Sequence, residues 1–139
     1  MAAGKPVSDF RTPLGRARGL GSAKHGVGHF IGQRASAVAL VLLVLWGVRS
    51  ALKLAAPGGG YEGAVAWVQF TPNTIILILL LGVGAWHMQL GMRTVIEDYI
   101  GRPATRIACL LLNVFAAWGG FAVAAVAILK VAATNLGGA

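Results

Sequence analysis

Three side chains with useful chemistry follow one another in the run HMQLGMRTVIEDY, where a long apolar stretch gives way to a polar one. His87 lies inside the apolar stretch, whereas Asp98 and Tyr99 lie beyond Arg93 in the polar part. A neutral imidazole in apolar surroundings can ligate haem iron, or it can bond a neighbouring helix. A phenol at a polar boundary can donate a hydrogen bond to a quinone oxygen, or it can anchor the chain at a membrane surface.

The neighbours of His87 are compatible with either use of the imidazole. On a helix, Gly84 and Gly91 lie within about 60° of His87, where a flat macrocycle or another helix can approach the backbone. The chain has no second histidine inside an apolar stretch, so a haem held by two histidines requires a second chain. Met88 and Met92 are conceivable sixth ligands, or contacts to lipid or a partner.

Two charged residues accompany these candidates. Asp98 follows His87 by eleven residues, which places it about 16 Å further along a helix and on nearly the same face. Its carboxylate can hold Tyr99, relay protons, or simply be solvated. Arg34 closes a basic segment directly before the first apolar run. There it can fix the membrane orientation, or its guanidinium can bind a haem propionate.

The elements that must position these residues are membrane-spanning helices. The chain has 139 residues, of which 57% are hydrophobic and 12% charged, and this composition excludes an ordinary soluble domain. A hydrocarbon core of about 30 Å needs roughly 20 helical residues, and the stretches at about 35–54, 74–96 and 107–129 are long enough. We therefore expect an all-α membrane protein, with a basic cytoplasmic segment at 1–34 and a three-helix transmembrane anchor domain at 35–139.

The distribution of charge predicts the orientation. Six Lys and Arg residues and a single acid precede the first helix, so the positive-inside rule places the N-terminus in the cytoplasm. Three crossings then put the loop 55–73, with its GGGYEG stretch, and the C-terminus outside, and the loop 93–106 inside. Topology and anionic lipid explain the net charge of +8, and we expect no nucleic-acid partner. Cys109, the single cysteine, excludes an internal disulfide.

Two segments carry a resemblance to a known family. One is TPLGRARGLGSAKHGVGHFIGQRASA, residues 12–37, and the other is a pattern of His, three residues, Gly-Met, five residues and Asp-Tyr. The pattern is met by His87, Gly91, Met92, Asp98 and Tyr99. In both segments the chain resembles the D-type hydrophobic membrane-anchor subunit of succinate dehydrogenase, respiratory complex II, in its alphaproteobacterial version.

The resemblance implies a set of roles. The anchor would have three transmembrane helices, share one haem b with the C-type cytochrome b anchor subunit, and form part of a pocket for ubiquinone as substrate. His87 would be the axial ligand of the haem iron, Tyr99 the quinone hydrogen-bond donor with Asp98 beside it, and Arg34 a neighbour of the haem propionates. The iron–sulfur subunit and the flavoprotein subunit would dock on its cytoplasmic face, and the chain would have no catalytic residue and no activity alone.

Other interpretations stay open. The chain can be the anchor of a quinol:fumarate reductase, or a haem-free structural or transport membrane subunit in which His87 only bonds another helix. His25 and His29 are expected to be solvated or to contact a soluble partner. Because the matching segment starts by about Thr12, we expect no cleavable presequence. We therefore favour the bacterial inner membrane, with a periplasmic C-terminus, over the mitochondrial inner membrane.

Overall fold

The fold was analysed in a computed structural model that describes residues 12–15, 26–57 and 59–134. Within these ranges the helices of more than one turn are α2 (Gly26–Ala55), α3 (Gly60–Gln69), α4 (Thr71–Tyr99) and α5 (Pro103–Ala132). The same ranges contain no strand, so the predicted all-α class is confirmed. Much of the basic N-terminal segment, including His25, lies outside the described residues.

Three of these helices are long and apolar enough to cross a membrane, as the sequence predicted. α2, α4 and α5 contain 30, 29 and 30 residues, and at a rise of 1.5 Å per residue each is about 45 Å long. This exceeds a hydrocarbon core of about 30 Å. Each helix therefore extends past the apolar layer, or crosses it at a tilt.

α2 begins earlier than expected, at Gly26 rather than near Ala35. Hydropathy marks where an apolar stretch starts, but a helix continues for as long as its backbone hydrogen bonds and packing are favourable. The additional turns pack against α4. At Gly32 the two helices are so close that an added Cβ atom would lie 3.4 Å from the side chains of both Trp86 and Leu90. Arg34 consequently lies within α2 and not ahead of it.

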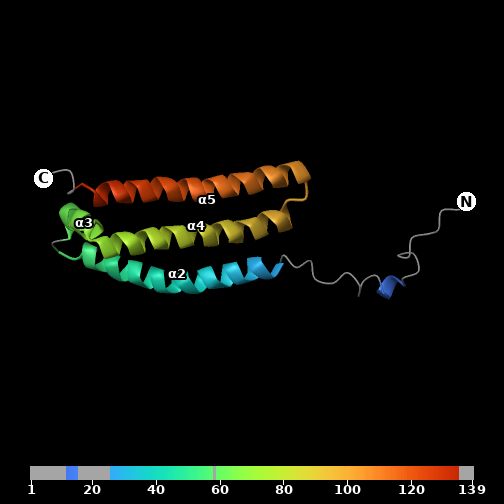
Figure 1. Ribbon diagram of the computed structural model, residues 1–139, viewed down its shortest axis with the longest axis horizontal. Helices are drawn as coiled ribbons and strands as arrows, with labels where there is room; N and C mark the ends of the chain where they lie inside the picture. The colour runs from blue at the N-terminus through green and yellow to red at the C-terminus, as the bar shows by residue number, and fades with distance from the viewer. Residues whose placement is uncertain (1–11, 16–25, 58, 135–139) are drawn as a thin grey trace, which may run out of the picture.

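The three long helices lie side by side, with α4 between α2 and α5 (Figure 1). α4 contacts both neighbours, and no contact between α2 and α5 occurs within the described ranges. The N-terminal end of α2 and the link from α4 to α5 lie at one end of this layer, here called the connection end. The short helix α3 lies at the other end, beside the C-terminal end of α5.

The two links between long helices differ from the expected loops. Most of the predicted inner loop 93–106 is helical, and only residues 100–102 separate α4 from α5, which starts with Pro103. The outer link contains α3, where a loop was expected around GGGYEG. Two glycines allow the tight turn into α3: a Cβ atom at Gly59 would lie 1.9 Å from the Leu54 carbonyl oxygen, and Gly60 has φ +50°.

α3 closes its end of the layer through side-chain contacts with the long helices. The rings of Trp46 in α2 and Trp67 in α3 lie with centroids 5.4 Å apart. The Asn73 amide donates to the Trp67 carbonyl oxygen at 2.9 Å, and the Gln69 amide donates to Thr134 Oγ1 at 2.8 Å. These contacts fix the spacing of the long helices at this end.

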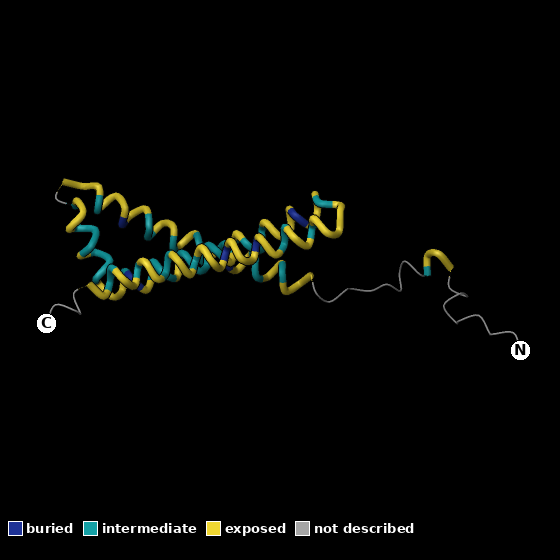
Figure 2. The backbone as a smooth tube through the Cα atoms, turned by 90° about the horizontal axis from the view of Figure 1, so that it is seen from above, coloured by how far each residue is buried: buried dark blue, intermediate teal, exposed yellow. Residues whose placement is uncertain are grey.

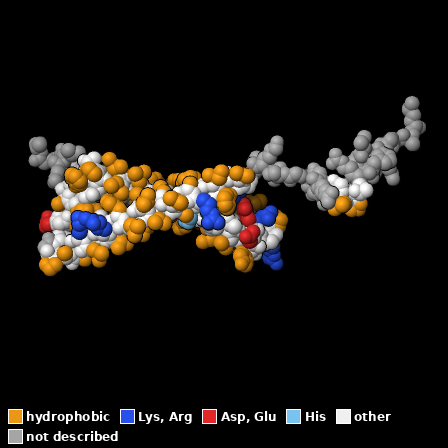
Figure 3. All heavy atoms as spheres, turned by 90° about the horizontal axis from the view of Figure 1, so that it is seen from below, with side chains coloured by type: hydrophobic (Ala, Val, Ile, Leu, Met, Phe, Trp, Pro, Cys, Tyr) orange, Lys and Arg blue, Asp and Glu red, His pale blue; other side chains and the backbone are white. Residues whose placement is uncertain are grey.

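The burial pattern is that of a protein whose solvent is lipid. Few of the described residues are buried (Figure 2). Large apolar side chains are exposed along the helices. Most of the buried residues are polar: Ser36, Ser50, Thr74 and Asn113, beside Ile96 and Ala117. Figure 3 shows hydrophobic side chains over the middle of the molecule and charged ones gathered toward its two ends. Helices in a bilayer associate through small and polar contacts of this kind.

Candidate functional site

His87 lies on α4 and faces α2, where both ring nitrogens meet polar side chains. Its Nδ1 is 2.9 Å from Ser36 Oγ, and its Nε2 is 3.3 Å from Gln33 Nε2. Ser36 Oγ is also 3.1 Å from the Gln33 carbonyl oxygen, to which it donates. α2 therefore orients the imidazole, and the sequence analysis identified neither Gln33 nor Ser36.

The imidazole stands between a polar and an apolar pocket along α2. The polar pocket has a volume of about 370 Å³ and is lined by His29, Phe30, Gln33, Arg34, Ala37, His87 and Thr94. The apolar pocket has a volume of about 400 Å³ and is lined by Ala37, Leu40, Val41, Val44, Leu45 and His87. A ligand that reached both pockets would meet a cation at one end and aliphatic side chains at the other.

Arg34 supplies the cation of the polar pocket. Its side chain is exposed, and the guanidinium carbon lies 5.2 Å from the centre of the Phe30 ring. A cation over an aromatic face is held electrostatically. The structure thus brings Arg34 and His87 to one pocket, although 53 positions separate them in the sequence (87 − 34).

Two buried polar atoms of this region have no hydrogen-bond partner among the described residues: His29 Nε2 and Gln33 Oε1. His29 also lines a larger pocket of about 770 Å³ toward the connection end, together with Arg93 and Glu97. It is half-buried and faces α4, which differs from the solvated histidine that the sequence suggested. His29, Gln33 and Ser36 have the spacing of one helix face, which could have indicated that they act together. The sequence analysis missed this because it predicted a helix start near residue 35.

Asp98 and Tyr99 occupy the last turn of α4, at the connection end and apart from the His87 pocket. The Tyr99 side chain is 85% exposed and Asp98 is exposed. No hydrogen bond or ion pair of either residue occurs within the described part of the chain. Since α4 is continuous, Tyr99 lies about 18 Å along the axis from His87.

The two glycines near His87 have different surroundings. A Cβ atom at Gly91 would lie 3.4 Å from Gln33 Nε2, so the absence of a side chain at Gly91 leaves room for the Gln33 side chain of α2. Gly84 lines an apolar groove of about 370 Å³, which it shares with Met88 and with small residues of α5. Gly91 therefore fits the helix-packing alternative, and Gly84 remains accessible beside the groove.

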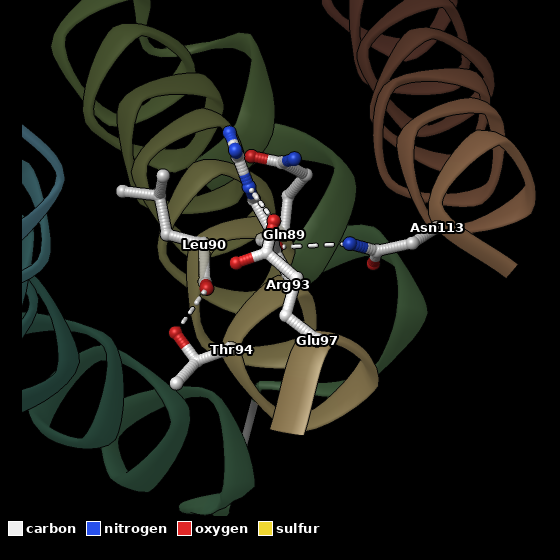
Figure 4. A network of polar contacts seen from close by, with 6 residues as sticks. All are labelled: Gln89, Leu90, Arg93, Thr94, Glu97 and Asn113. Atoms are coloured by element: carbon white, nitrogen blue, oxygen red, sulfur yellow. Dashed lines mark hydrogen bonds and ion pairs between the residues drawn. The ribbon is translucent and has the colours of Figure 1, made fainter. Parts of the chain in front are cut away.

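The part of α4 between His87 and Tyr99 is held by a further set of polar contacts (Figure 4). The buried Asn113 of α5 donates to the Gln89 carbonyl oxygen at 2.9 Å. Arg93 and Glu97 form an ion pair of 2.8 Å on the exposed face. The contact from Asn113 fixes α5 against α4 close to the candidate ligand.

Three helices that are long and apolar enough to cross a membrane, with a histidine between two of them, define an integral membrane protein. Residues 8–129 match the family model described as succinate dehydrogenase/fumarate reductase transmembrane subunit. The chain belongs to this family and is a membrane-anchor subunit, as the resemblance predicted.

Similar curated proteins carry the same description, succinate dehydrogenase hydrophobic membrane anchor subunit. The chain is 38% identical to that of Rickettsia bellii over 93 residues, which cover 66% of this chain and 72% of the relative. It is 34% identical to that of Paracoccus denitrificans over 128 residues, which cover 92% and 95%. The relative from Rickettsia conorii is 30% identical over 107 residues, covering 76% and 83%. No solved structure matches the chain.

Proposed function

We propose that this chain is the anchor of a succinate dehydrogenase, that it binds haem b through His87, and that Tyr99 and Asp98 contribute to a site for ubiquinone reduction. The observation that carries the haem part is the placement of His87 beside Arg34 in one pocket between α2 and α4. The family match supports the role of anchor.

The residues around His87 fit a haem. The imidazole Nε2 fits an iron ligand, the Arg34 guanidinium fits a propionate carboxylate, and the aliphatic pocket fits the porphyrin edge. The unpartnered His29 Nε2 and Gln33 Oε1 support this fit, because buried polar atoms normally have partners. When bound, the haem supplies one-electron redox chemistry. His87 would hold its iron, and Arg34 would neutralise propionate charge.

The quinone part of the proposal rests on the end of α4. Tyr99 is exposed and without a partner in the described residues, so its hydroxyl is available to a ligand at the membrane surface. A phenol that donates to a quinone oxygen stabilises the negative charge that develops during reduction. Asp98 lies beside it and can exchange protons with water. Neither side chain has a partner within the described residues, so we propose that partner subunits complete the pocket.

The arrangement in the complex follows from the same features. The connection end, with Tyr99, is proposed to face the cytoplasm of a bacterial cell, where the iron–sulfur and flavoprotein subunits dock. The C-type cytochrome b anchor would cover α4 and supply the second histidine. Hydride chemistry on succinate would occur at the flavin, so the contribution of this chain is binding, orientation and electrostatics.

A spectrum of the purified complex tests the haem assignment. We expect a reduced-minus-oxidised spectrum with a b-type α band, and its loss or displacement in His87→Ala. Ile75→Val is the matched control on the same helix, because Ile75 is 53% exposed and lies about three turns from His87 on α4. Ile75→Val should leave the spectrum unchanged. An unchanged spectrum in His87→Ala would remove this residue as the ligand.

The haem-free interpretation is the second candidate, and the bonds of His87 to α2 favour it specifically. Ser36 and Gln33 already satisfy both ring nitrogens, as in an ordinary interhelical contact. In that case the isolated complex would be without a b-type band. A quinol:fumarate reductase would retain the band, and the preferred direction of turnover, measured with succinate and with fumarate, distinguishes that anchor from the proposed one.

A further inference from the structure

We propose that Ser36 is a positioning residue for His87: its hydroxyl oxygen accepts a hydrogen bond from Nδ1–H of the imidazole, so Nε2 is the nitrogen with the free electron pair. The inference rests on the proposed haem site. It adds a residue on α2 that sets the orientation and the electron density of the ligand on α4.

The contacts of Ser36 support this direction of its hydrogen bond with His87. Ser36 has the most buried side chain of the described residues, with 1% exposure. Its hydroxyl can donate its one proton to the Gln33 carbonyl oxygen at 3.1 Å, an atom that can only accept. In the proposed arrangement, the 2.9 Å contact with His87 Nδ1 uses a lone pair of Ser36 Oγ, and Nδ1 carries the proton.

The contact at the other ring nitrogen agrees with this tautomer. Gln33 presents its amide nitrogen to His87 Nε2 at 3.3 Å, and an amide NH₂ group can only donate. Nε2 is therefore the acceptor. The distance is long for an N–H···N bond, and Gln33 Oε1 has no partner, so this side chain is weakly held and can be displaced by a ligand. Ser36 makes the shorter contact and stays buried.

A hydrogen bond at the far nitrogen of a metal-ligating histidine has two effects. It fixes the plane of the ring, and it raises the basicity of the ligating nitrogen by drawing the Nδ1 proton partly away. Greater donation stabilises ferric over ferrous iron and lowers the midpoint potential. Arg34 lies two positions before Ser36 on the same helix. α2 would therefore both bind the haem propionates, through Arg34, and adjust the basicity of His87 Nε2, through Ser36.

The experiment is a redox titration of the whole complex carrying Ser36→Ala. We expect the haem to remain and the ratio of reduced to oxidised haem at a fixed potential to rise about tenfold, which is a positive shift of about 59 mV for one electron. We also expect the largest g value of the ferric signal to move, because it depends on the angle between the axial imidazole planes. Ser36→Thr, which retains the hydroxyl, should restore both readings.

Ser50→Ala is the matched control. Ser50 is a second buried serine of α2, with 8% exposure, and lies about 21 Å from Ser36 along the helix axis. Its removal should leave potential and g values unchanged. If Ser36→Ala does not assemble, Ser36→Cys replaces it, because a thiol of similar size accepts hydrogen bonds poorly and should shift the potential in the same direction.

The outcomes separate the two proposals. Wild-type potential and g values in Ser36→Ala, or in Ser36→Cys where the alanine variant does not assemble, overturn the positioning role while the haem site stands. A shift of equal size in Ser50→Ala overturns it as well. A wild-type complex that contains no haem overturns the proposed function and this inference together.

Discussion

At the scale of single residues, the polar side chains of this chain have two distinct environments. Ser36, His87 and Asn113 lie between helices and meet a partner on a neighbouring helix. Tyr99 and Asp98 lie exposed at the end of α4 without a partner in the described ranges. The first group determines how the helices pack and how the imidazole is oriented. The second group is available to molecules that come from outside this chain.

The proposed role of Tyr99 gives a prediction at this scale. Tyr99→Phe removes the hydroxyl and retains the ring, so we expect assembly and dye-linked succinate oxidation to persist. A hydrogen bond to a developing charge is worth about 1.5–3 kcal/mol, so quinone reduction should fall about 10- to 100-fold. The measurement is steady-state quinone reduction by the purified complex.

Tyr61→Phe is the control for this change. Tyr61 is the other tyrosine of the chain, is 80% exposed and lies on α3 at the opposite end. It should retain the full rate of quinone reduction. Equal rates in the two variants would show that the Tyr99 hydroxyl takes no part in the reaction.

At the scale of elements, α4 is the helix on which the arrangement depends. It contacts both α2 and α5, and it carries His87 near its middle and Tyr99 at its end. Its position against α2 is fixed partly by the His87 contacts, and its position against α5 by the Asn113 contact. A change that loosens α4 is therefore expected to affect both candidate sites.

Asn113→Leu tests the contact between α4 and α5. It removes the bond to the Gln89 carbonyl oxygen, and polar contacts between membrane helices contribute about 0.6 kcal/mol on average and up to about 1.7. We expect a loss of stability in this range and a lower midpoint of thermal dissociation of the complex. Val123→Ala, at a 74% exposed position of α5, is the control. A midpoint in Asn113→Leu no lower than in the control would contradict the assigned role.

At the scale of the whole molecule, the helices form an open layer with little interior. The buried residues are few and mostly polar, and large apolar side chains cover the outer surface. Such a layer exposes apolar surface that suits a lipid environment. This agrees with membership in a family of anchor subunits. The orientation that the positive-inside rule predicts for this layer is a further prediction.

Labelling of single cysteines in intact cells tests the proposed orientation. In a complex whose anchor carries Cys109→Ala, Glu62→Cys on α3 should react with a membrane-impermeant maleimide, because α3 is proposed to face the periplasm. Thr105→Cys, near the connection end, should react only after the cells are opened. Both residues are exposed in the chain itself. The reverse pattern would invert the topology and move Tyr99 to the periplasmic surface.

The sequence by itself determined the class of the protein. Apolar stretches of about 20 residues leave few options in a bilayer, because every backbone hydrogen bond must be made within the segment. The same argument predicted three spanning helices, and the fixed pattern from His87 to Tyr99 identified the family. These features depend on local composition and spacing, which can be read along the chain.

Tertiary structure decided which residues meet. Hydropathy could not show that α2 starts at Gly26, because the added turns are stabilised by packing on α4 and not by apolar composition. It also could not pair Ser36 and Gln33 with His87, since 51 and 54 positions separate them. Contacts of this length depend on how two helices lie against each other, and small or amide side chains leave no distinctive pattern in the sequence.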